Sequence, residues 1–178
     1  MIEARRLRKE IEIPAGVEVE VKDTLVVKGP KGEVSKKLFY PTVEITKQEN
    51  KIVIEPKNLT KREKKMINTY KAHILNMFKG VQEPFTYKVK ICSSHFPMTV
   101  SVKDQTLVVK NFYGEKVPRK AKILDGVDVK VNGDEIVLTG ASKEAVGQTA
   151  GNFEKSTRIT NRDRRIFQDG LWITEKSK

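Results

Sequence analysis

Four arginines fall within eight residues near the C-terminus of the sequence, and two aromatic residues follow them closely. Guanidinium groups bind phosphate oxygens through paired hydrogen bonds, and they also stack on bases and on aromatic rings. An arginine cluster interleaved with aromatic residues therefore favours contact with a nucleic acid. The residues concerned are Arg158, Arg162, Arg164, Arg165, Phe167 and Trp172.

Two amide side chains and several apolar residues accompany these arginines. Asn161 and Gln168 offer donors and acceptors to base edges or ribose hydroxyls. An ordinary charged terminus is the alternative interpretation. However, Ile166-Phe167 and Leu171-Trp172-Ile173 would fit poorly in a disordered tail. We therefore expect these apolar residues to dock on the domain and to hold the arginines in place.

No arrangement of residues in the sequence is typical of catalysis. Cys92 and His95 lie three residues apart, but no other cysteine completes a zinc site. Ser93, His95 and Asp104 could be written as a triad, yet no pattern places them together. His73 is expected to be packed or exposed rather than reactive. We therefore predict that the protein is not an enzyme and needs no metal or other cofactor.

The composition indicates a basic protein with a polyanionic partner. The 178 residues carry a formal net charge of +12, and the final segment 155–178 holds seven basic and three acidic residues. The N-terminal sequence is basic without a hydrophobic segment behind it, there is no long apolar run, and the single cysteine cannot form an internal disulfide. We expect a cytosolic protein with no membrane partner and no small-molecule substrate.

A hairpin sequence occurs twice in the chain. Val21 to Glu33 and Val102 to Glu115 both read as strand, polar turn and strand, with one inserted residue, Gln105. Gly29–Gly32 and 111–114 fill the same four-residue slot, and we expect one turn geometry to serve both. The repeat extends to the following strand pairs and to a helix after each. The sequence thus predicts an α+β protein of two tandem duplicated domains, residues 1–81 and 82–178, each an antiparallel β-sheet packed with an α-helix.

The two predicted helices differ in character. Thr60 and Glu63 form a capping box for the first, and Gly80 is expected to end it. Lysines and arginines crowd its surface, either as a solvated face or as phosphate contacts. Ser142 can cap the second helix, whose Gly147 and Gly151 allow close packing on its own sheet or close approach of a sugar-phosphate chain. The apolar stripes are Ile67, Tyr70, Ile74, Met77 and Phe78 in the first helix, and Val146, Ala150 and Phe153 in the second.

Three segments together resemble the ribosomal protein L6 family of the large subunit, in its archaeal and eukaryotic-type branch. Ile13–Val17 followed by Val27–Gly32 is similar to the opening of the family, and His95-Phe96-Pro97 to the start of its second domain. The segment 161–170 is the most specific, although Trp172 stands where the family is expected to have tyrosine or phenylalanine. The resemblance covers essentially the whole chain.

This resemblance implies a structural, non-enzymatic protein that binds large-subunit ribosomal RNA. It implies a position near the stalk base and the factor-binding sarcin–ricin region, with neighbouring ribosomal proteins of the stalk base as further partners. Carried over by position, the RNA-facing residues are Asn161, Arg162, Arg164, Arg165 and Gln168, with Gln148, Asn152 and Lys155 on the second helix. A free-standing nucleic-acid-binding regulator and an RNA-acting enzyme remain the alternative functions.

Overall fold

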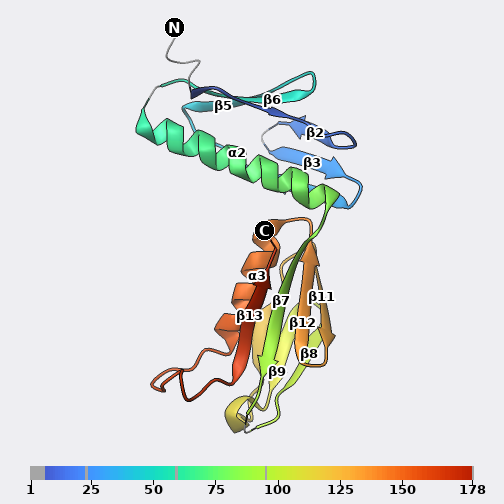
Figure 1. The fold of residues 1–178 in the computed structure, drawn as a ribbon, viewed down its shortest axis with the longest axis vertical. Coiled ribbons are helices and arrows are strands. Elements are labelled where there is room, and N and C mark those ends of the chain that lie inside the picture. Colours follow the sequence, from blue (N-terminus) through green and yellow to red (C-terminus); the bar gives the residue numbers. More distant parts are fainter. Residues whose placement is uncertain (1–6, 23, 59, 95, 178) are drawn as a thin grey trace. The chain divides into compact units, whose positions relative to one another are not determined.

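A computed structural model describes residues 7–22, 24–58, 60–94 and 96–177 of the chain. The N-terminal segment 1–6 and His95, on which sequence predictions were made, lie outside the described residues. The chain divides into two compact units, Met1–Pro84 and Phe85–Lys178. Both combine antiparallel strands with one long helix, and the α+β class expected from the sequence is confirmed (Figure 1).

The first unit contains two antiparallel sheets of three strands rather than a single sheet. One sheet has the order β1-β6-β5 and the other the order β2-β3-β4. Alternating apolar residues face the interior, so that Val19, Val27 and Ile52 are almost fully buried. The strands are β1 (Lys9–Glu12), β2 (Glu18–Val21), β3 (Leu25–Gly29), β4 (Gly32–Lys36), β5 (Val43–Gln48) and β6 (Lys51–Pro56).

Helix α2 (Lys61–Gln82) covers the core of the first unit with the apolar stripe predicted from its spacing. All five residues of the stripe are buried. Thr60 caps the helix by accepting a hydrogen bond from the backbone nitrogen of Arg62 at 3.2 Å. The buried Glu63 carboxylate accepts bonds from the hydroxyls of Thr60 and Thr42, and these bonds lower its pKa.

The predicted helix end at Gly80 is wrong, because α2 continues through this glycine to Gln82. Gly80 is buried and belongs to the packed face of the helix. The helix ends where Pro84 disfavours helical dihedrals at the preceding residue, and Glu83 accordingly adopts an extended conformation. The two compact units divide after Pro84, three residues beyond the boundary expected from the sequence.

The second unit repeats this architecture with one additional strand. Its sheets have the orders β10-β9-β8 and β11-β12-β7-β13, and all pairs are antiparallel. Strand β13 has no counterpart among the described strands of the first unit, and it pairs with β7 on the side opposite β12 (Figure 1). The strands are β7 (Phe85–Cys92), β8 (Thr99–Lys103), β9 (Thr106–Lys110), β10 (Arg119–Lys122), β11 (Val127–Asn132), β12 (Glu135–Gly140) and β13 (Gly170–Lys176).

Helix α3 (Lys143–Ser156) closes the core of the second unit as the sequence predicts. Ser142 caps it by accepting a bond from the backbone nitrogen of Ala145 at 3.3 Å. Val146, Ala150 and Phe153 are fully buried against the sheets. The stripe is short because the helix is short, and β13 supplies the further apolar residue Leu171.

The prediction that one turn geometry serves both copies of the hairpin is wrong. The first copy makes a tight two-residue connection, in which Gly29 pairs with Gly32. The second copy opens into a longer connection that contains the short helical turn η1 (Phe112–Gly114). Asn111 and Tyr113 adopt positive φ angles of 60° and 47° in this connection. The physical reason is that Phe112 turns into the core, where it is 1% exposed.

Candidate nucleic-acid interface

The arginine cluster lies on one loop of the second unit, between α3 and β13. We call residues 158–169 the arginine loop (Figure 1, the orange-red segment between these two elements). The ends of the loop are joined, because the Thr157 hydroxyl accepts a bond from the backbone nitrogen of Leu171 at 3.0 Å. A Cβ atom added at Gly170 would lie only 3.2 Å from the same hydroxyl oxygen. The φ angle of Gly170 is 146°, a backbone conformation in which any larger residue would be strained.

Strand β13 anchors the C-terminal end of the loop. Leu171 is 1% exposed, and Trp172 and Ile173 are half-buried, as the docking prediction requires. Phe167 is also half-buried. Ile166 departs from the prediction, because its side chain is 75% exposed. It sits in a turn closed by bonds from the nitrogens of Ile166 and Phe167 to the carbonyl of Asp163, and this turn buries only one of the two neighbouring side chains.

Arg119 of β10 anchors the other end of the loop, a role that no pattern in the sequence indicates. Its Nη1 donates to the carbonyl oxygens of Ser156 and Arg158 at 3.0 and 3.1 Å. Its Nε and Nη2 bind the Glu115 carboxylate at 2.7 and 2.6 Å and lower the pKa of that group. The guanidinium also lies 4.3 Å from the centre of the Phe112 ring. Arg119 is thus a positioning residue whose donors are directed inward.

Arg162 stacks on an aromatic pair. Its guanidinium carbon lies 4.8 Å from the centre of the Phe167 ring and 6.0 Å from that of Tyr113. The two rings themselves meet edge to face at 6.1 Å. Arg162 is exposed, so its N–H donors remain accessible to a partner while the guanidinium contacts the rings.

Arg164 stacks in the same way on Trp172, at 4.8 Å from the ring centre. The indole nitrogen donates to the carbonyl of Gln168 at 2.9 Å, which fixes the ring beneath the arginine. Gln168 in turn donates its amide nitrogen to the carbonyl of Arg165 at 3.0 Å. This amide group, predicted to contact bases, therefore also stabilises the loop itself.

Arg165 is held by a carboxylate instead of a ring. Its Nη2 lies 2.7 Å from Oδ2 of Asp163, and its backbone nitrogen donates to Oδ1 of the same group. This pairing lowers the pKa of Asp163. The Arg165 side chain is 90% exposed, so its remaining donors face solvent. Asn161 is exposed too, with a φ angle of 58° that bends the loop before the arginine cluster.

Asp169 is a further residue that the sequence did not single out. Its carboxylate is 3% exposed and accepts bonds from the backbone nitrogen of Ser94, at 2.9 Å, and from the Ser94 hydroxyl. It thereby ties the end of the arginine loop to the segment after β7. Burial, and secondarily the charge of Asp169, raise the pKa of Tyr113. Only the tertiary structure brings these groups together.

The predicted residues of α3 form a strip that leads toward the arginine loop. Gln148, Asn152 and Lys155 recur at spacings of four and three, so they share one helix face. Gln148 donates to Asn152 at 3.0 Å, and Asn152 donates to the carbonyl of Lys122 at 3.2 Å. A Cβ atom added at Gly151 would meet nothing within 4 Å, whereas one added at Gly147 would contact Tyr87 of strand β7.

The described part of the chain shows no alternative chemical centre. Among the described residues there is no cluster of three or more possible metal ligands. The hypothetical zinc pair and triad both require His95, which the structure does not describe. Where the chain is described, no helix is long and apolar enough to span a membrane.

Comparison with known proteins gives a consistent result. The model of the family described as ribosomal protein L6 matches twice, at residues 13–84 and 96–170. Large ribosomal subunit protein uL6 of Methanobrevibacter smithii is 50% identical over 177 residues, which cover 99% of both chains. The uL6 protein of Methanococcus vannielii is 47% identical over 175 residues, covering 98% of this chain and 96% of the relative.

Proposed function

Because the chain belongs to the ribosomal protein L6 family, we propose that it is a structural constituent of the large ribosomal subunit that binds ribosomal RNA through the arginine loop. As a member of this family of structural proteins it is not an enzyme. Its proposed location is the ribosome in the cytoplasm. The relatives named uL6 are large-subunit proteins, and their similarity over nearly the whole chain supports this assignment.

One observation carries the RNA-binding part of the proposal, namely the fixed positions of the arginines. Arg162 and Arg164 each rest on an aromatic ring, and Arg165 is held by Asp163. The loop that bears them is bonded at both ends. A preorganised donor loses less conformational entropy when it binds phosphate than a freely rotating side chain does. Such an array suits the closely spaced phosphates of folded RNA.

A second contact is proposed for the exposed strip of α3. Gln148 and Lys155 lie one turn on either side of Gly151, which has open space above it. A sugar-phosphate chain can approach the helix backbone closely at such a position. Asn152 takes part as the residue that fixes the Gln148 amide, and Arg158 continues the strip into the loop.

Specificity is expected to come mainly from the shape of the RNA. Contacts of arginine and lysine with phosphate position a protein but carry little sequence information. Asn161 and Gln168 are the proposed contacts to base edges or ribose hydroxyls. We further propose, from the family resemblance, that the binding region lies near the stalk base and the sarcin–ricin region, beside the ribosomal proteins of the stalk base.

Sedimentation and crosslinking test the proposal together. A ribosomal constituent should remain with large subunits through a high-salt wash, whereas a free-standing regulator should be released. Ultraviolet crosslinking with mapped peptides should recover RNA-linked peptides from residues 158–170 and from α3. Recovery of crosslinks wholly from other segments, with the arginine loop unmodified, would contradict the proposed interface.

The fluorescence of the single tryptophan provides an independent measurement of RNA binding in solution. Trp172 lies under Arg164, so RNA bound at that arginine should change the indole fluorescence. The change should vanish in Arg164→Ala at RNA concentrations that saturate binding. An unchanged fluorescence in the wild-type protein on saturation would place the RNA elsewhere.

A further inference from the structure

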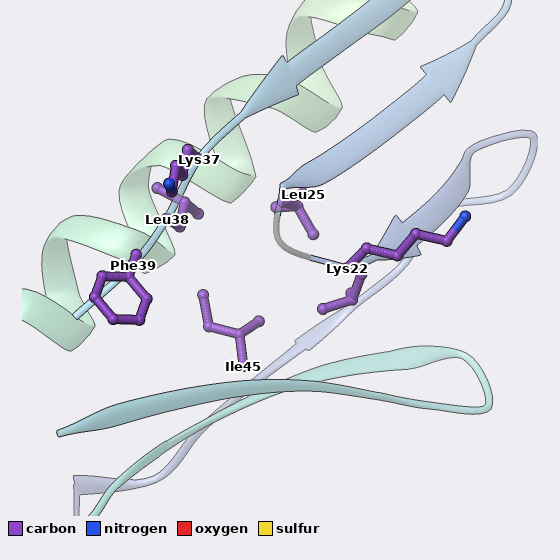
Figure 2. A pocket seen from close by; sticks show the side chains of 7 residues that line it. Lys22, Leu25, Lys37, Leu38, Phe39 and Ile45 are labelled. Carbon is purple, nitrogen blue, oxygen red and sulfur yellow. The ribbon is translucent and has the colours of Figure 1, made fainter. Parts of the chain in front are cut away.

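The first unit contains an open groove between its two sheets, lined by apolar side chains and two lysines. The groove has a volume of about 470 Å³. Leu25 of β3 and Ile45 of β5 point into it from the two sheets, and Leu38 lines it from the segment after β4 (Figure 2). The space continues along the edges of β2 and β5 over Val19 and Thr46. Beside it Phe39 is 74% exposed, which is unusual for a large aromatic side chain.

The second unit shows that this groove is not a necessary consequence of the architecture. The repeat places Leu107 at the position of Leu25, and Val129 at that of Ile45. In the second unit Ile123, in the segment after β10, is 4% exposed and belongs to the core. Its backbone nitrogen donates to the carbonyl of Gln105 at 2.9 Å, which pulls the segment inward. Ile123, at the position that Leu38 holds in the first unit, is therefore packed into the core, whereas Leu38 lines the groove.

The charges around the groove indicate the chemistry of an occupant. Lys22 and Lys37 belong to its lining, and both are exposed. Within the described residues Lys37 forms no ion pair, and Lys22 has only a 3.5 Å contact with Glu20, in which the lysine side chain is 81% exposed. Apolar side chains beside two exposed lysines complement a bulky apolar side chain that is flanked by carboxylates.

We propose that this groove binds an acidic protein segment that inserts one large apolar side chain between the sheets. Leu25, Leu38 and Ile45 form the apolar receptor, Phe39 covers the inserted side chain, and Lys22 and Lys37 bind the flanking carboxylates. Nucleic acid fits less well, because five of the seven lining residues are apolar and only two are cationic. The groove shares no residue with the arginine loop.

The test uses the full chain with Arg162, Arg164 and Arg165 replaced by alanine, so that acidic probes cannot bind the arginine loop. The probe is a fluorescein-labelled twelve-residue peptide of aspartate and glutamate around a central Leu-Phe pair. Its control has serines in place of that pair. Fluorescence anisotropy should show binding of the first peptide and at least roughly fivefold weaker binding of the second.

Matched variants locate the binding. The double variant Lys22→Glu with Lys37→Glu should bind the Leu-Phe peptide at least about tenfold more weakly, because two attractive charges become repulsive. Lys64→Glu with Lys65→Glu makes the same charge change on α2 and should alter binding less than about twofold. Phe39→Ser should lower the affinity for the peptide. It should leave the thermal unfolding temperature unchanged, since the Phe39 side chain is already exposed.

Four outcomes would overturn the proposal. Equal binding of the serine peptide would show that only charge is recognised, and so would equal losses in the two lysine pairs. Displacement of the peptide by a twelve-nucleotide oligouridylate would assign the groove to nucleic acid. Self-association in sedimentation velocity that is abolished by Phe39→Ser would show that a second copy of the chain covers it.

Discussion

The two units share one architecture but hold their positive charges in different ways. On α2 of the first unit, Lys61, Arg62, Lys64 and Lys65 are exposed, and the described residues provide no ion pair for any of them. In the second unit Arg162 and Arg164 lie on rings, and Arg165 on a carboxylate. The additional strand β13 makes this possible, because it returns the chain to the sheet and closes the loop. The two units therefore differ in whether their cationic side chains are held in place, which net charge alone does not reveal.

Removing the anchor of β13 should have the largest effect. We expect Leu171→Ala to lower the free energy of unfolding of the second unit by about 3 to 4 kcal/mol, because it leaves a cavity in the core. RNA affinity should fall as well, since the arginine loop loses its support. Ile52→Ala makes a comparable cavity in the first unit and should leave RNA affinity unchanged. Thermal unfolding measures the stability of both variants, and RNA titration measures their affinity. An equal loss of RNA affinity in the two variants would contradict the proposed difference between the units.

Removing the fixed arginines should have the next largest effect. If three phosphate contacts are lost, Arg162→Ala with Arg164→Ala and Arg165→Ala should weaken RNA binding about a hundredfold at about 0.1 M salt. The slope of log affinity against log salt should flatten by roughly 2. The matched triple Lys61→Ala, Arg62→Ala and Lys64→Ala should change the slope by less than about 0.7. A larger change in the α2 triple would assign the phosphate contacts to the first unit.

Breaking the clamp at the start of the loop should have an intermediate effect. Arg119→Met keeps the hydrophobic stem but loses the bonds to the carbonyls of Ser156 and Arg158, at a cost of about 2 kcal/mol of stability. In the first unit, Arg8→Met removes only surface ion pairs with Glu10 and Glu55, and it should cost less than about 1 kcal/mol. Denaturant unfolding measures both, and similar costs would show that Arg119 has no special role.

The same clamp should give the second unit a particular pH dependence. The hydrogen bonds from Arg119 lower the pKa of Glu115 below its usual 4.5. A carboxyl whose pKa is lower in the folded state stabilises the fold above its unfolded pKa, and this stability is lost as the pH falls through the folded pKa. Unfolding followed below pH 4.5 should therefore show a steeper loss in the wild-type protein than in Arg119→Met. If the stability of the two proteins fell equally with pH, Glu115 would not contribute to the pH dependence.

Filling the open space on α3 should have the smallest effect. It should raise the stability of the fold but lower the affinity for RNA. Gly151→Ala should raise stability by up to about 1 kcal/mol, because alanine favours the helix and its Cβ meets no neighbour. If RNA approaches this face, affinity should fall by a few-fold despite the higher stability. Gly147→Ala, whose Cβ would contact Tyr87 instead of open space, is the control and should leave RNA affinity unchanged. An unchanged affinity in Gly151→Ala would remove α3 from the interface.

The sequence by itself determined the class of the fold, the duplication, the helix caps and the apolar stripes. These features depend on local spacing, and a stripe such as Val146, Ala150 and Phe153 has only one way to be buried. The arginine cluster was visible for the same reason, since its residues are neighbours in the chain. The family resemblance rests on such local segments, and the comparisons confirm it.

Only the tertiary structure decided how these parts are held. The bonds from Arg119 to Ser156 and from Ser94 to Asp169 join residues far apart in the chain, and no local pattern encodes them. Equivalent segments also diverged, since Phe112 enters the core where Pro30 makes a tight turn, and Ile123 is buried in the core where Leu38 lines the open groove. Packing chooses between such alternatives through the volume available around each side chain, and that volume exists only once the chain has folded.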